Sequence, residues 1–403
     1  MANVSSSNGL EKRPKLRFPG FDEPWKETNL STLFSKSTQK NADGHITNVI
    51  CNSAKHGLIP QREYFDKDIA NSDNTSGYYI IRQNDFVYNP RKSSDAPYGP
   101  ISSYKYAEDG IVSPLYLCFH AKGEINPLYY EWYFRSSAWH RYIYMSGDSG
   151  ARHDRVSIKD ETFFAMPINL PSEQEQSKIA SFLQSLDERI AAQEKLVASL
   201  KKYKRGVVDG IFSRKLNFSY PQTWAELEIS ELFMPISDKG YSDKIVLTIV
   251  QGEGTMPRDS VDRRIAYDKS TISSYKRVLP NDFILHLRSF EGGLEIVNEE
   301  GVVSPAYTIL RARNEIIPLF FYTFFRSYWF INSKLRISVE GIRDGKSINM
   351  NTFWHIKVPV PSIEEQRHIS ALISSIDNRI KIAEFEYKRL LQIRVGLMQQ
   401  LFI

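Results

Sequence analysis

Two long stretches of the chain carry apolar residues at the three- and four-residue spacing of an amphipathic helix, with charged and polar residues between them. The first covers residues 171–212 and the second covers residues 361–402. The spacing predicts one continuous helix in each stretch, with a narrow apolar seam that needs a partner helix. The seam positions are Ile179, Leu183, Leu186, Ile190, Val197, Leu200, Ile369, Ile373, Ile376, Ile380, Leu390 and Leu397.

The two stretches are copies of one pattern, displaced from each other by about 190 residues. The matching positions include Pro171 with Pro361, Glu175 with Glu365, Asp187 with Asp377, and Gly206 with Gly396. A repeat of this length indicates that the chain consists of two equivalent halves, which predicts a pseudo-symmetric protein.

Each stretch begins with the signature of a helix N-terminus. Ser172 precedes Glu175 by three residues, and Ser362 precedes Glu365 by the same interval. In such a capping box the serine accepts a bond from the N–H three residues on, and the glutamate returns to the N–H of the serine. We therefore expect both helices to start just after their prolines, which lie outside the hydrogen-bonded ladder.

The segments before the two helices open in the same way. Trp25 lies nine residues before Phe34, and Trp224 lies nine residues before Phe233. Each tryptophan is therefore expected to anchor a globular segment.

The interiors of the two segments share a skeleton of strand and helix signals. Within 83–88 and again within 280–285, an Asn-Asp turn precedes a short apolar run, which predicts a strand after each turn. A proline followed by aromatic residues predicts helix starts at Pro127 and Pro318. The fold class is therefore α+β, with two mixed domains separated by two long helices. The expected division is a disordered tail at 1–15, a first domain at 16–171, a central helix at 172–213, a second domain at 214–361 and a C-terminal helix at 362–403.

The nearest partner for each apolar seam is the other copy. Two helices related by the pseudo-two-fold repeat would run antiparallel, as a rod of about 60 Å at about 1.5 Å per residue. Such a rod would hold two domains at a fixed separation. The alternative, two unrelated helices that each cover their own domain, is disfavoured because their length exceeds what one domain can cover. The outer face of the first helix, which includes Glu194, Lys195, Lys201 and Lys202, is solvated surface by default and a candidate docking face.

The composition is that of an ordinary globular protein. Of the 403 residues, 41% are hydrophobic and 25% are charged, and the formal net charge is +5. This charge permits a nucleic-acid partner without requiring one. Cys51 and Cys118 lie far apart, which predicts free thiols in a reducing compartment. No run reaches the roughly 18 apolar residues of a membrane span, and the polar start lacks a signal-peptide core, so we expect a cytoplasmic protein.

The chain lacks a recognisable catalytic motif. Residues 341–347 resemble a phosphate-binding loop, but only three residues separate the glycines and no strand-to-helix context surrounds them. Residues 88–91, Tyr-Asn-Pro-Arg, lack the second proline and the aromatic residue of an amino-methyltransferase motif. The histidines show none of the paired spacings of a metal site. We therefore expect a non-catalytic chain that binds no metal or cofactor itself.

Basic and polar residues cluster where the two segments differ most. Arginine and lysine beside asparagine, tyrosine and serine can hold phosphates and read base edges. A single cluster of this kind is usually solvated surface, but recurrence at 88–92 and 286–289 favours DNA binding. The candidate DNA-contacting residues are Lys55, Arg62, Tyr88, Asn89, Arg91, Lys92, Arg152, Arg155, Arg258, Arg263, Arg264, His286, Arg288, Ser289, Arg343 and Lys346.

The chain resembles the specificity subunits of type I restriction-modification systems. The pattern Glu-Gln-x-x-Ile, followed by Asp-x-Arg-Ile, occurs in both long stretches. The opening Leu-Arg-Phe-Pro-Gly-Phe of residues 16–21, with Trp25 behind it, completes the resemblance. It covers the chain from about residue 16 to its end.

The resemblance implies a function. Each domain would be a target recognition domain that reads one half of a split, asymmetric site in double-stranded DNA. The helices would form an antiparallel coiled coil that sets the spacer. Two methyltransferase (modification) subunits would dock on this chain and methylate adenine at N6 with S-adenosylmethionine. Restriction/translocase subunits would add cleavage that depends on ATP and Mg²⁺, while the chain itself supplies no catalytic residue.

Two other classes of function stay open. A coiled-coil scaffold would join proteins without touching DNA, and its duplex binding would lack a steep salt dependence. A self-contained modification enzyme would need a cofactor-binding turn and the motif missing at 88–91. Methyl transfer by the purified chain alone would support that second alternative.

Overall fold

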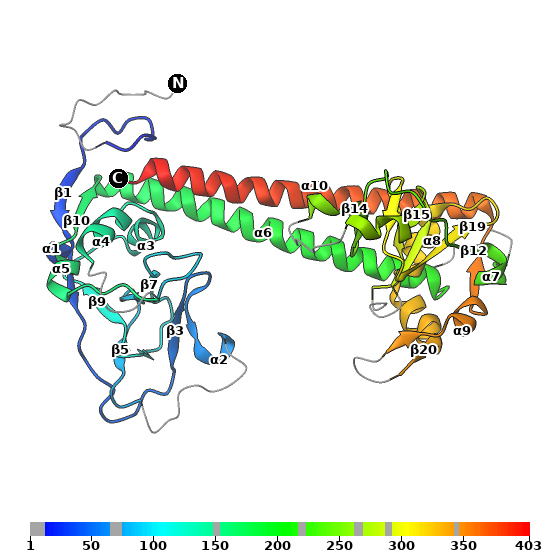
Figure 1. The fold of residues 1–403 in the computed structure, drawn as a ribbon. Helices are drawn as coiled ribbons and strands as arrows, with labels where there is room; N and C mark the ends of the chain where they lie inside the picture. The colour runs from blue at the N-terminus through cyan, green and yellow to red at the C-terminus, as the bar shows by residue number, and fades with distance from the viewer. Residues whose placement is uncertain are drawn as a thin grey trace. The chain divides into compact units, whose positions relative to one another are not determined.

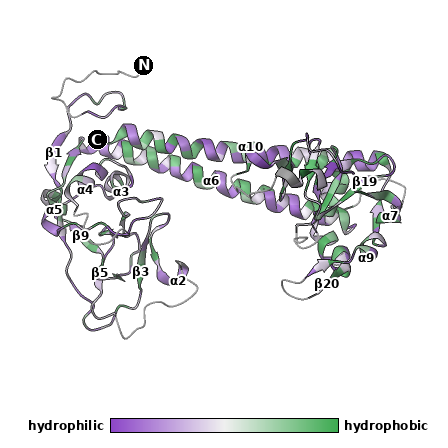
Figure 2. Cartoon of the chain, in the orientation of Figure 1, coloured by the Kyte–Doolittle hydropathy of each residue, from purple (hydrophilic) through white to green (hydrophobic). Residues whose placement is uncertain are grey.

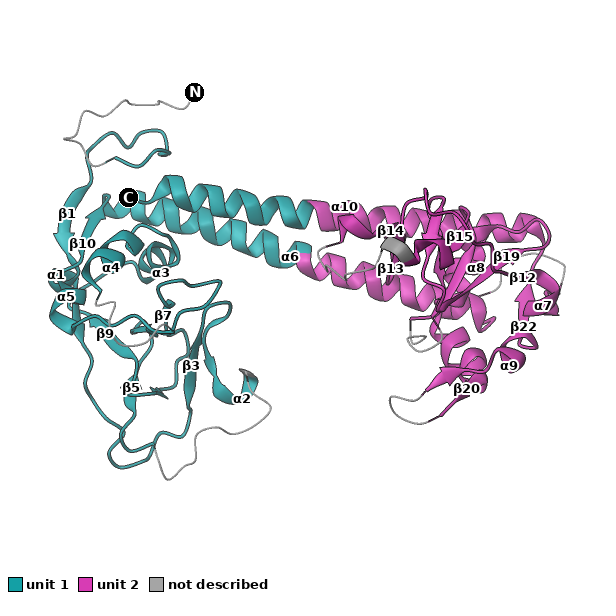
Figure 3. Cartoon of the chain, in the orientation of Figure 1, with its two compact units in different colours: residues 1–193, 386–403 teal, residues 194–385 magenta. Residues whose placement is uncertain are grey.

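The structure, a computed structural model, describes residues 13–64, 75–147, 154–216, 223–261, 269–286, 292–341 and 346–403. These residues fall into two compact units (Figure 3). Unit 1 combines residues 1–193 with residues 386–403, and unit 2 contains residues 194–385. Each unit therefore joins one mixed domain to parts of both long helices. The predicted fold class, with two α+β domains and a long helix between them, is confirmed.

The domain of unit 1 is built on a four-stranded antiparallel sheet (Figure 1). Its strand order is β2 (Phe34–Lys36), β9 (Leu117–Ala121), β6 (Phe86–Tyr88) and β7 (Ile101–Ser103). The antiparallel pairs beside it are β1 (Lys26–Asn29) with β10 (Pro167–Leu170), β3 (Ile50–Ser53) with β4 (Gly57–Pro60), and β5 (Tyr79–Ile81) with β8 (Gly110–Val112). The short helices are α1 (Leu30–Leu33), α2 (Gln61–Tyr64), α3 (Pro127–Arg135), α4 (His140–Ser146) and α5 (Asp160–Phe164).

The domain of unit 2 repeats this topology. Its four-stranded sheet has the order β12 (Phe233–Ile236), β19 (Tyr307–Ala312), β16 (Phe283–His286) and β17 (Glu295–Ile296). The pairs are β11 (Ala225–Glu228) with β22 (Lys357–Val360), β13 (Leu247–Val250) with β14 (Gly254–Pro257), β15 (Lys276–Val278) with β18 (Gly301–Val303), and β20 (Val339–Glu340) with β21 (Ser347–Ile348). The short helices are α7 (Ile229–Leu232), α8 (Pro318–Phe325) and α9 (Met350–Trp354). The short 3-10 segments are η2 (Arg258–Ser260), η3 (Lys269–Ser274) and η5 (Leu335–Ser338), and η4 (Phe330–Lys334) is a π-helical segment.

The predicted turn before the central strand occurs in both domains. Asn84 and Asn281 have positive φ angles of 70° and 73°, a conformation that asparagine adopts more easily than most residues. The following aspartate closes each turn, because Asp85 and Asp282 accept a backbone N–H bond at 2.8 Å. The strands β6 and β16 then begin as predicted, and α3 and α8 start at the predicted prolines.

Aromatic rings form the equivalent cores of the two domains. In unit 1, Phe34 of β2 meets Phe86 of β6 edge-on, with ring centroids 5.5 Å apart. In unit 2, Phe233 and Phe283 form the same contact at 5.6 Å. All four rings are buried. Edge-to-face pairs of this kind add to the stabilisation from apolar burial, so each sheet is held by the same packing unit.

The long helices are α6 (Glu173–Phe212) and α10 (Ile363–Leu401). Ser172 Oγ accepts from Glu175 N at 3.3 Å, and Ser362 Oγ accepts from Glu365 N at 3.2 Å, so each serine caps its helix as predicted. The predicted return bond from the glutamates is wrong, because both carboxylates are buried and point into the domains.

Each of these glutamates holds the tryptophan that opens its domain. Trp25 Nε1 donates to Glu175 Oε2 at 3.2 Å, and Trp224 Nε1 donates to Glu365 Oε1 at 2.9 Å. Arg17 adds two bonds of 2.8 Å to Glu175. The repeated Glu-Gln motif therefore joins each domain to the first turn of its own long helix.

Within each unit the two long helices run antiparallel. In unit 2, Lys204 Nζ lies 2.6 Å from Asp377 Oδ1, and Lys201 Nζ lies 2.7 Å from Glu384 Oε1. As the residue number rises on α6 it falls on α10. Unit 1 shows the same direction, with Arg394 Nη1 at 2.5 Å from Asp187 Oδ1 and Arg189 at 3.6 Å from Glu386.

The apolar positions of both helices face the protein interior. Hydrophobic residues recur along the two helices among hydrophilic ones (Figure 2). The seam residues that are buried are Ile179, Leu183, Ile190, Ile369, Ile373, Ile376, Ile380 and Leu390, and those that are half-buried are Leu186, Val197, Leu200 and Leu397. The helices also join the domain cores, since Leu401 and Phe402 pack with the unit 1 core. Part of each seam therefore packs on a domain as well as on the other helix.

Candidate nucleic-acid interface

A short backbone bridge brings three basic residues of unit 1 together. Arg91 pairs with Arg155 in an isolated antiparallel bridge, and Lys92 N donates to Asp154 O at 2.8 Å. We call Arg91, Lys92 and Arg155 the basic bridge. Like charges opposite each other destabilise a strand pair. The Asp154 carboxylate, 3.9 Å from Arg155 Nε, offsets part of this charge, and a phosphate would offset the rest.

The loop that carries the basic bridge has a well-defined backbone. Asn89 N donates to Pro100 O at 3.0 Å, which extends the pairing of β6 and β7. Gly99 has a φ of +83°, and a Cβ atom there would collide with Asn89 O. Asn89 Oδ1 accepts from Arg91 N at 3.0 Å, a turn that leaves the Arg91 side chain exposed.

Asn52 fastens the β3–β4 hairpin to the central sheet. Its Nδ2 donates to Val87 O at 2.7 Å, and its Oδ1 accepts from Ser102 Oγ at 2.8 Å. The side chain of Lys55 is exposed in the turn of this hairpin, and that of Arg62 is exposed on α2. The buried, hydrogen-bonded Asn52 side chain therefore fixes the hairpin that carries the exposed Lys55.

Two residues predicted to contact DNA have other roles. Tyr88 is 2% exposed, its hydroxyl donates to Tyr98 O at 2.8 Å, and its ring stacks on Phe163 at 5.1 Å. The prediction for Tyr88 is wrong, because the alternation of side chains along β6 directs it into the core, where burial raises its pKa. Asn89 is half-buried, and its Nδ2 donates to Asn52 O at 3.1 Å, so its amide shapes the loop.

Tyr307 is the centre of a basic cluster in unit 2. This half-buried residue of β19 lies opposite His286 of β16, with ring centroids 5.3 Å apart. Lys276 Nζ donates to Tyr307 O at 2.6 Å, and desolvation lowers the pKa of that lysine. Burial raises the pKa of Tyr307, and the charge of Arg258 opposes this shift. Of the residues predicted from separate clusters, His286 contacts Tyr307 directly, and Arg258 acts on this tyrosine through its charge.

The equivalent residue of unit 1, Tyr116, also feels the charge of an arginine. Burial raises the pKa of Tyr116, and a hydrogen bond with the backbone of Asn52 and, to a smaller extent, the charge of Arg91 oppose this shift. Neither tyrosine was predicted as a site residue. Both follow a Ser-Pro-x sequence at matching places, 113–116 and 304–307, so the repeat alignment contained the signal. A tyrosine beside a guanidinium offers both a ring face and a phosphate-binding cation.

The remaining predicted contacts lie at or beyond the edges of the described segments. Lys346 is exposed directly before β21. The predicted contacts that lie outside the described residues are Arg152, Arg263, Arg264, Arg288, Ser289 and Arg343. Candidate residues therefore gather separately in each unit: in the basic bridge of unit 1, and in the cluster around Tyr307 of unit 2.

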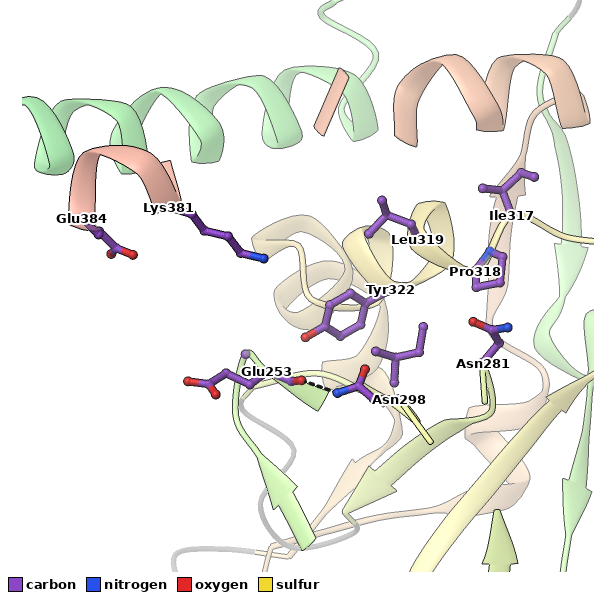
Figure 4. A pocket seen from close by; sticks show the side chains of 11 residues that line it. Glu253, Asn281, Asn298, Ile317, Pro318, Leu319, Tyr322, Lys381 and Glu384 are labelled. Atoms are coloured by element: carbon purple, nitrogen blue, oxygen red, sulfur yellow. Dashed lines mark hydrogen bonds between the residues drawn. The ribbon is translucent and has the colours of Figure 1, made fainter. Parts of the chain in front are cut away.

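Unit 2 also contains a cavity of about 850 Å³ that involves α8, the β13–β14 turn and α10 (Figure 4). Asn298 Nδ2 donates to Glu253 O at 2.7 Å in its wall. The Tyr322 hydroxyl, which also lines it, donates to Glu295 Oε2 at 2.9 Å. The Asn298 and Tyr322 side chains are thus both hydrogen-bonded within the domain, and Lys381 extends from α10 toward Tyr322.

Cys118 is a buried thiol in the core of unit 1. Burial raises the pKa of the Cys118 thiol to about 12, which keeps it protonated at neutral pH. No group of His, Cys, Asp or Glu in these segments is arranged to hold a metal ion. Among the helices described, none combines the length and the apolar character needed to cross a bilayer.

Comparison with known proteins relates this arrangement to a family. The family described as "Type I restriction modification DNA specificity domain" matches residues 28–202 and again residues 221–392, one match in each half of the chain. The chain belongs to this family. The resemblance seen in the sequence motifs is therefore confirmed. The basic clusters of this type I specificity chain are the candidates for contacts with DNA.

A curated relative shares part of the sequence of this type I specificity chain. A protein of Methanocaldococcus jannaschii, named as the MjaX specificity subunit of a type I restriction enzyme, is 22% identical over 267 residues. The match covers 62% of this chain and 61% of that protein, less than two thirds of its length.

Three solved structures share the fold. The HsdS subunit from Thermoanaerobacter tengcongensis matches with a TM-score of 0.52 at 16% identity, over 96% of this chain and 97% of that one. The type I S subunit from M. genitalium matches with a TM-score of 0.51 at 17% identity, over 97% and 99%. A chain from a study of complex assembly and conformational transition of the type I R-M system matches with a TM-score of 0.61 at 15% identity, over 96% and 99%.

Proposed function

We propose that this type I specificity chain recognises a bipartite, asymmetric site in double-stranded DNA, with one half-site read by each domain. The observation that carries the proposal is the repetition of one domain topology in one chain, with the same tryptophan–glutamate bond to a long helix in each copy. Two domains with the same framework and different basic loops suit two different half-sites.

The basic bridge supplies the DNA contacts of the first domain. Arg91 and Lys92 are exposed, and Arg155 is half-buried beside them. Arginine side chains bind phosphates with paired bonds and can read guanine in the major groove. In the second domain Arg258, His286 and Lys276 around Tyr307 take the equivalent role. Tyr116 and Tyr307 support the neighbouring cations at the protein surface.

The paired helices set the spacer between the half-sites as an antiparallel coiled coil. Two observations within each unit support this role. Ion pairs join the antiparallel helices, and the apolar seam is buried or half-buried along both of them. Domains that bind one face of DNA need half-sites about one helical turn, or about 10 bp, apart. Inserting one heptad into both helices should lengthen the preferred spacer without changing either half-site. A spacer that stays the same after insertion would contradict this role.

The methyltransferase subunits dock on the helix faces around Gly206 and Gly396. Glycine inside a helix costs about 1 kcal/mol relative to alanine. In the described part of the chain, nothing lies within 4 Å of a Cβ atom built on either glycine. Exposed apolar residues precede both by three positions, Tyr203 and Ile393. A partner backbone can approach a glycine closely, and the repetition provides two equivalent docking faces for two copies of one partner.

A hollow beside the first of these glycines supports the docking face. It has a volume of about 450 Å³ and is lined by Tyr203, Gly206 and Leu216 among others. Of the charged residues expected on this outer face, Glu194, Lys195 and Lys202 are exposed. Lys201 is exposed too, but its ammonium pairs with Glu384 of α10.

In this proposal the partner subunits carry out the chemical reactions. The methyltransferase subunits bind S-adenosylmethionine and methylate adenine at N6, and restriction/translocase subunits bind ATP and Mg²⁺. This chain selects the site and holds the subunits together, without catalytic residues or a cofactor of its own. Its ligand, the bacterial chromosome or invading DNA, implies a cytoplasmic location.

Methylome sequencing of a host with and without this chain tests the proposal. We expect one bipartite adenine-methylation motif to disappear with the chain and to return with it. The competing role, a scaffold that never touches DNA, predicts an unchanged methylome together with duplex binding that lacks a steep salt dependence. An unchanged methylome in a host that holds the methyltransferase subunits would refute DNA specificity.

A further inference from the structure

Strand β7 of unit 1 lies between two polar clusters. Ser102 Oγ donates to Asn52 Oδ1 at 2.8 Å, and the neighbouring Ser103 Oγ donates to Glu131 Oε2 at 2.8 Å. Successive side chains of a strand point to opposite faces, so one strand serves both clusters. On the Ser102 side, Asn52 O accepts from Asn89 Nδ2 at 3.1 Å, which ties in the loop of the basic bridge.

The cluster on the Ser103 side reaches the long helices. Glu131 of α3 is 4% exposed, and its carboxylate lies 3.0 Å from Lys105 Nζ and 2.8 Å from Arg135 Nη2. Arg135 Nη1 lies 3.5 Å from Asp187 Oδ2 on α6. Arg394 of α10 binds the other oxygen of Asp187 at 2.5 Å. Arg135 therefore connects a buried carboxylate of the domain to a carboxylate shared by both helices.

The second domain has a different connection at the equivalent place. Arg326 follows Pro318 by the same eight residues that separate Arg135 from Pro127. Its guanidinium pairs with Glu295 of β17 and lies over the Tyr322 ring, so the contacts described for it stay within the domain. Near this helix, the cavity of Figure 4 opens between the domain and α10.

We propose that Arg135 is a positioning residue, which fixes the first domain on the helix pair and thereby narrows the range of spacers that the protein accepts. This inference rests on the proposed function. The path from the basic bridge to the helices runs through Asn52, β7, Glu131 and Arg135, and each step is a bond or ion pair with a preferred direction. Apolar packing is non-directional and tolerates small rotations, whereas a guanidinium between two carboxylates does not.

A spacer that is one base pair longer or shorter requires only a small movement of the first domain, so a single directional contact can oppose it. DNA rises about 3.4 Å per base pair along each strand, and a turn takes about 10 bp. A spacer that differs by one base pair therefore requires a small shift and rotation of one domain relative to the other half-site. A link that resists this movement in the first domain selects against neighbouring spacer lengths.

The test uses the full-length chain in complex with its methyltransferase subunits. The substrates are duplexes with constant half-sites and spacers one base pair shorter or longer than the preferred length. For Arg135→Gln, we expect methylation at the neighbouring spacers, relative to the preferred one, to rise about threefold to fivefold, the factor that a partly exposed ion pair supplies. Arg135→Lys keeps the charge and should recover most of the narrow preference.

Two further variants make the outcome decisive. Arg189→Gln is the matched control, since it removes an exposed arginine of α6 whose partner, Glu386 at 3.6 Å, lies on the other helix. Its spacer preference should stay that of the wild type. If Arg135→Gln does not fold, Arg135→Met keeps most of the apolar stem of the side chain and removes the same two ion pairs. A folded variant with the wild-type preference would overturn the inference alone, whereas a wild-type complex that methylates no member of the set would overturn the proposed function.

Discussion

The indole nitrogen of Trp25 donates a hydrogen bond to the Glu175 carboxylate at 3.2 Å, although 150 positions separate the two residues in the chain. The same carboxylate receives two bonds from Arg17 at 2.8 Å and has no exposed surface. In the second half, Trp224 and Glu365 form the same indole–carboxylate bond. This buried contact fixes the opening tryptophan of each domain to the first turn of its long helix, α6 or α10.

Replacing Glu175 with alanine should lower the free energy of unfolding by about 3–5 kcal/mol, because it leaves the charged Arg17 and the Trp25 indole without their acceptor. Glu365→Ala removes the acceptor of a neutral indole and should cost about 1–3 kcal/mol. Urea unfolding followed by tryptophan fluorescence measures both. Equal losses at the two sites would contradict the larger role assigned to Glu175.

Gly206→Ala should raise the free energy of unfolding of the isolated chain by about 0.5–1 kcal/mol, because alanine favours the helix and open space surrounds the site. Gly206→Trp should leave folding intact and weaken methyltransferase binding, measured by calorimetry. Tyr144→Trp, at an exposed position of α4 outside both long helices, is the control and should leave binding unchanged. Binding that is unaffected by Gly206→Trp would move the docking face elsewhere.

Arg91→Ala and Arg155→Ala should each weaken duplex binding and make it less salt-dependent. If each arginine contacts a phosphate, the slope of log K against log salt should become shallower by about one. A loss confined to one base position would instead identify a base-reading arginine. Lys388→Ala, which changes an exposed lysine of α10, should leave both affinity and slope unchanged. Binding is measured by fluorescence anisotropy at several salt concentrations.

His140 should make stability depend on pH. Its ring packs against Tyr98 and Trp139, with centroids 4.9 Å and 4.7 Å away, and burial lowers its pKa. The unfolded chain then binds the proton more readily than the folded one, so stability falls as the pH drops through the usual histidine range. Thermal unfolding at about pH 7.5 and about pH 5.5 should show a smaller loss for His140→Gln than for the wild type. Identical losses would show that other groups control this range.

Much of the fold was predictable because it depends on local patterns. The period of apolar residues and the flanking prolines specify α6 and α10, and the Asn-Asp turns specify where β6 and β16 begin. The repeat adds information, since the same signal occurs twice and each copy supports the other. Family membership follows from these same motifs.

The candidate site was less predictable because it depends on which side chains of a short strand or loop face the solvent and on how these short elements pack. Arg91 and Tyr88 are three residues apart, yet one is exposed and the other is in the core. His286 and Tyr307 come from different strands and meet only because β16 pairs with β19. Composition marks such residues as basic or aromatic, but it does not say which of them share a surface.

By itself, the sequence determined the two long helices, the two-fold repetition of the domains and the family, because these depend on periodicity, caps and motif order. Only the tertiary structure decided where the buried charges go. Glu175 could have closed a capping box but instead binds Trp25 and Arg17, and the buried Glu131 binds the exposed Arg135, which also contacts Asp187. The physical reason is that a carboxylate removed from water binds whichever donors the packed domain brings within reach, and these donors lie far away in the chain.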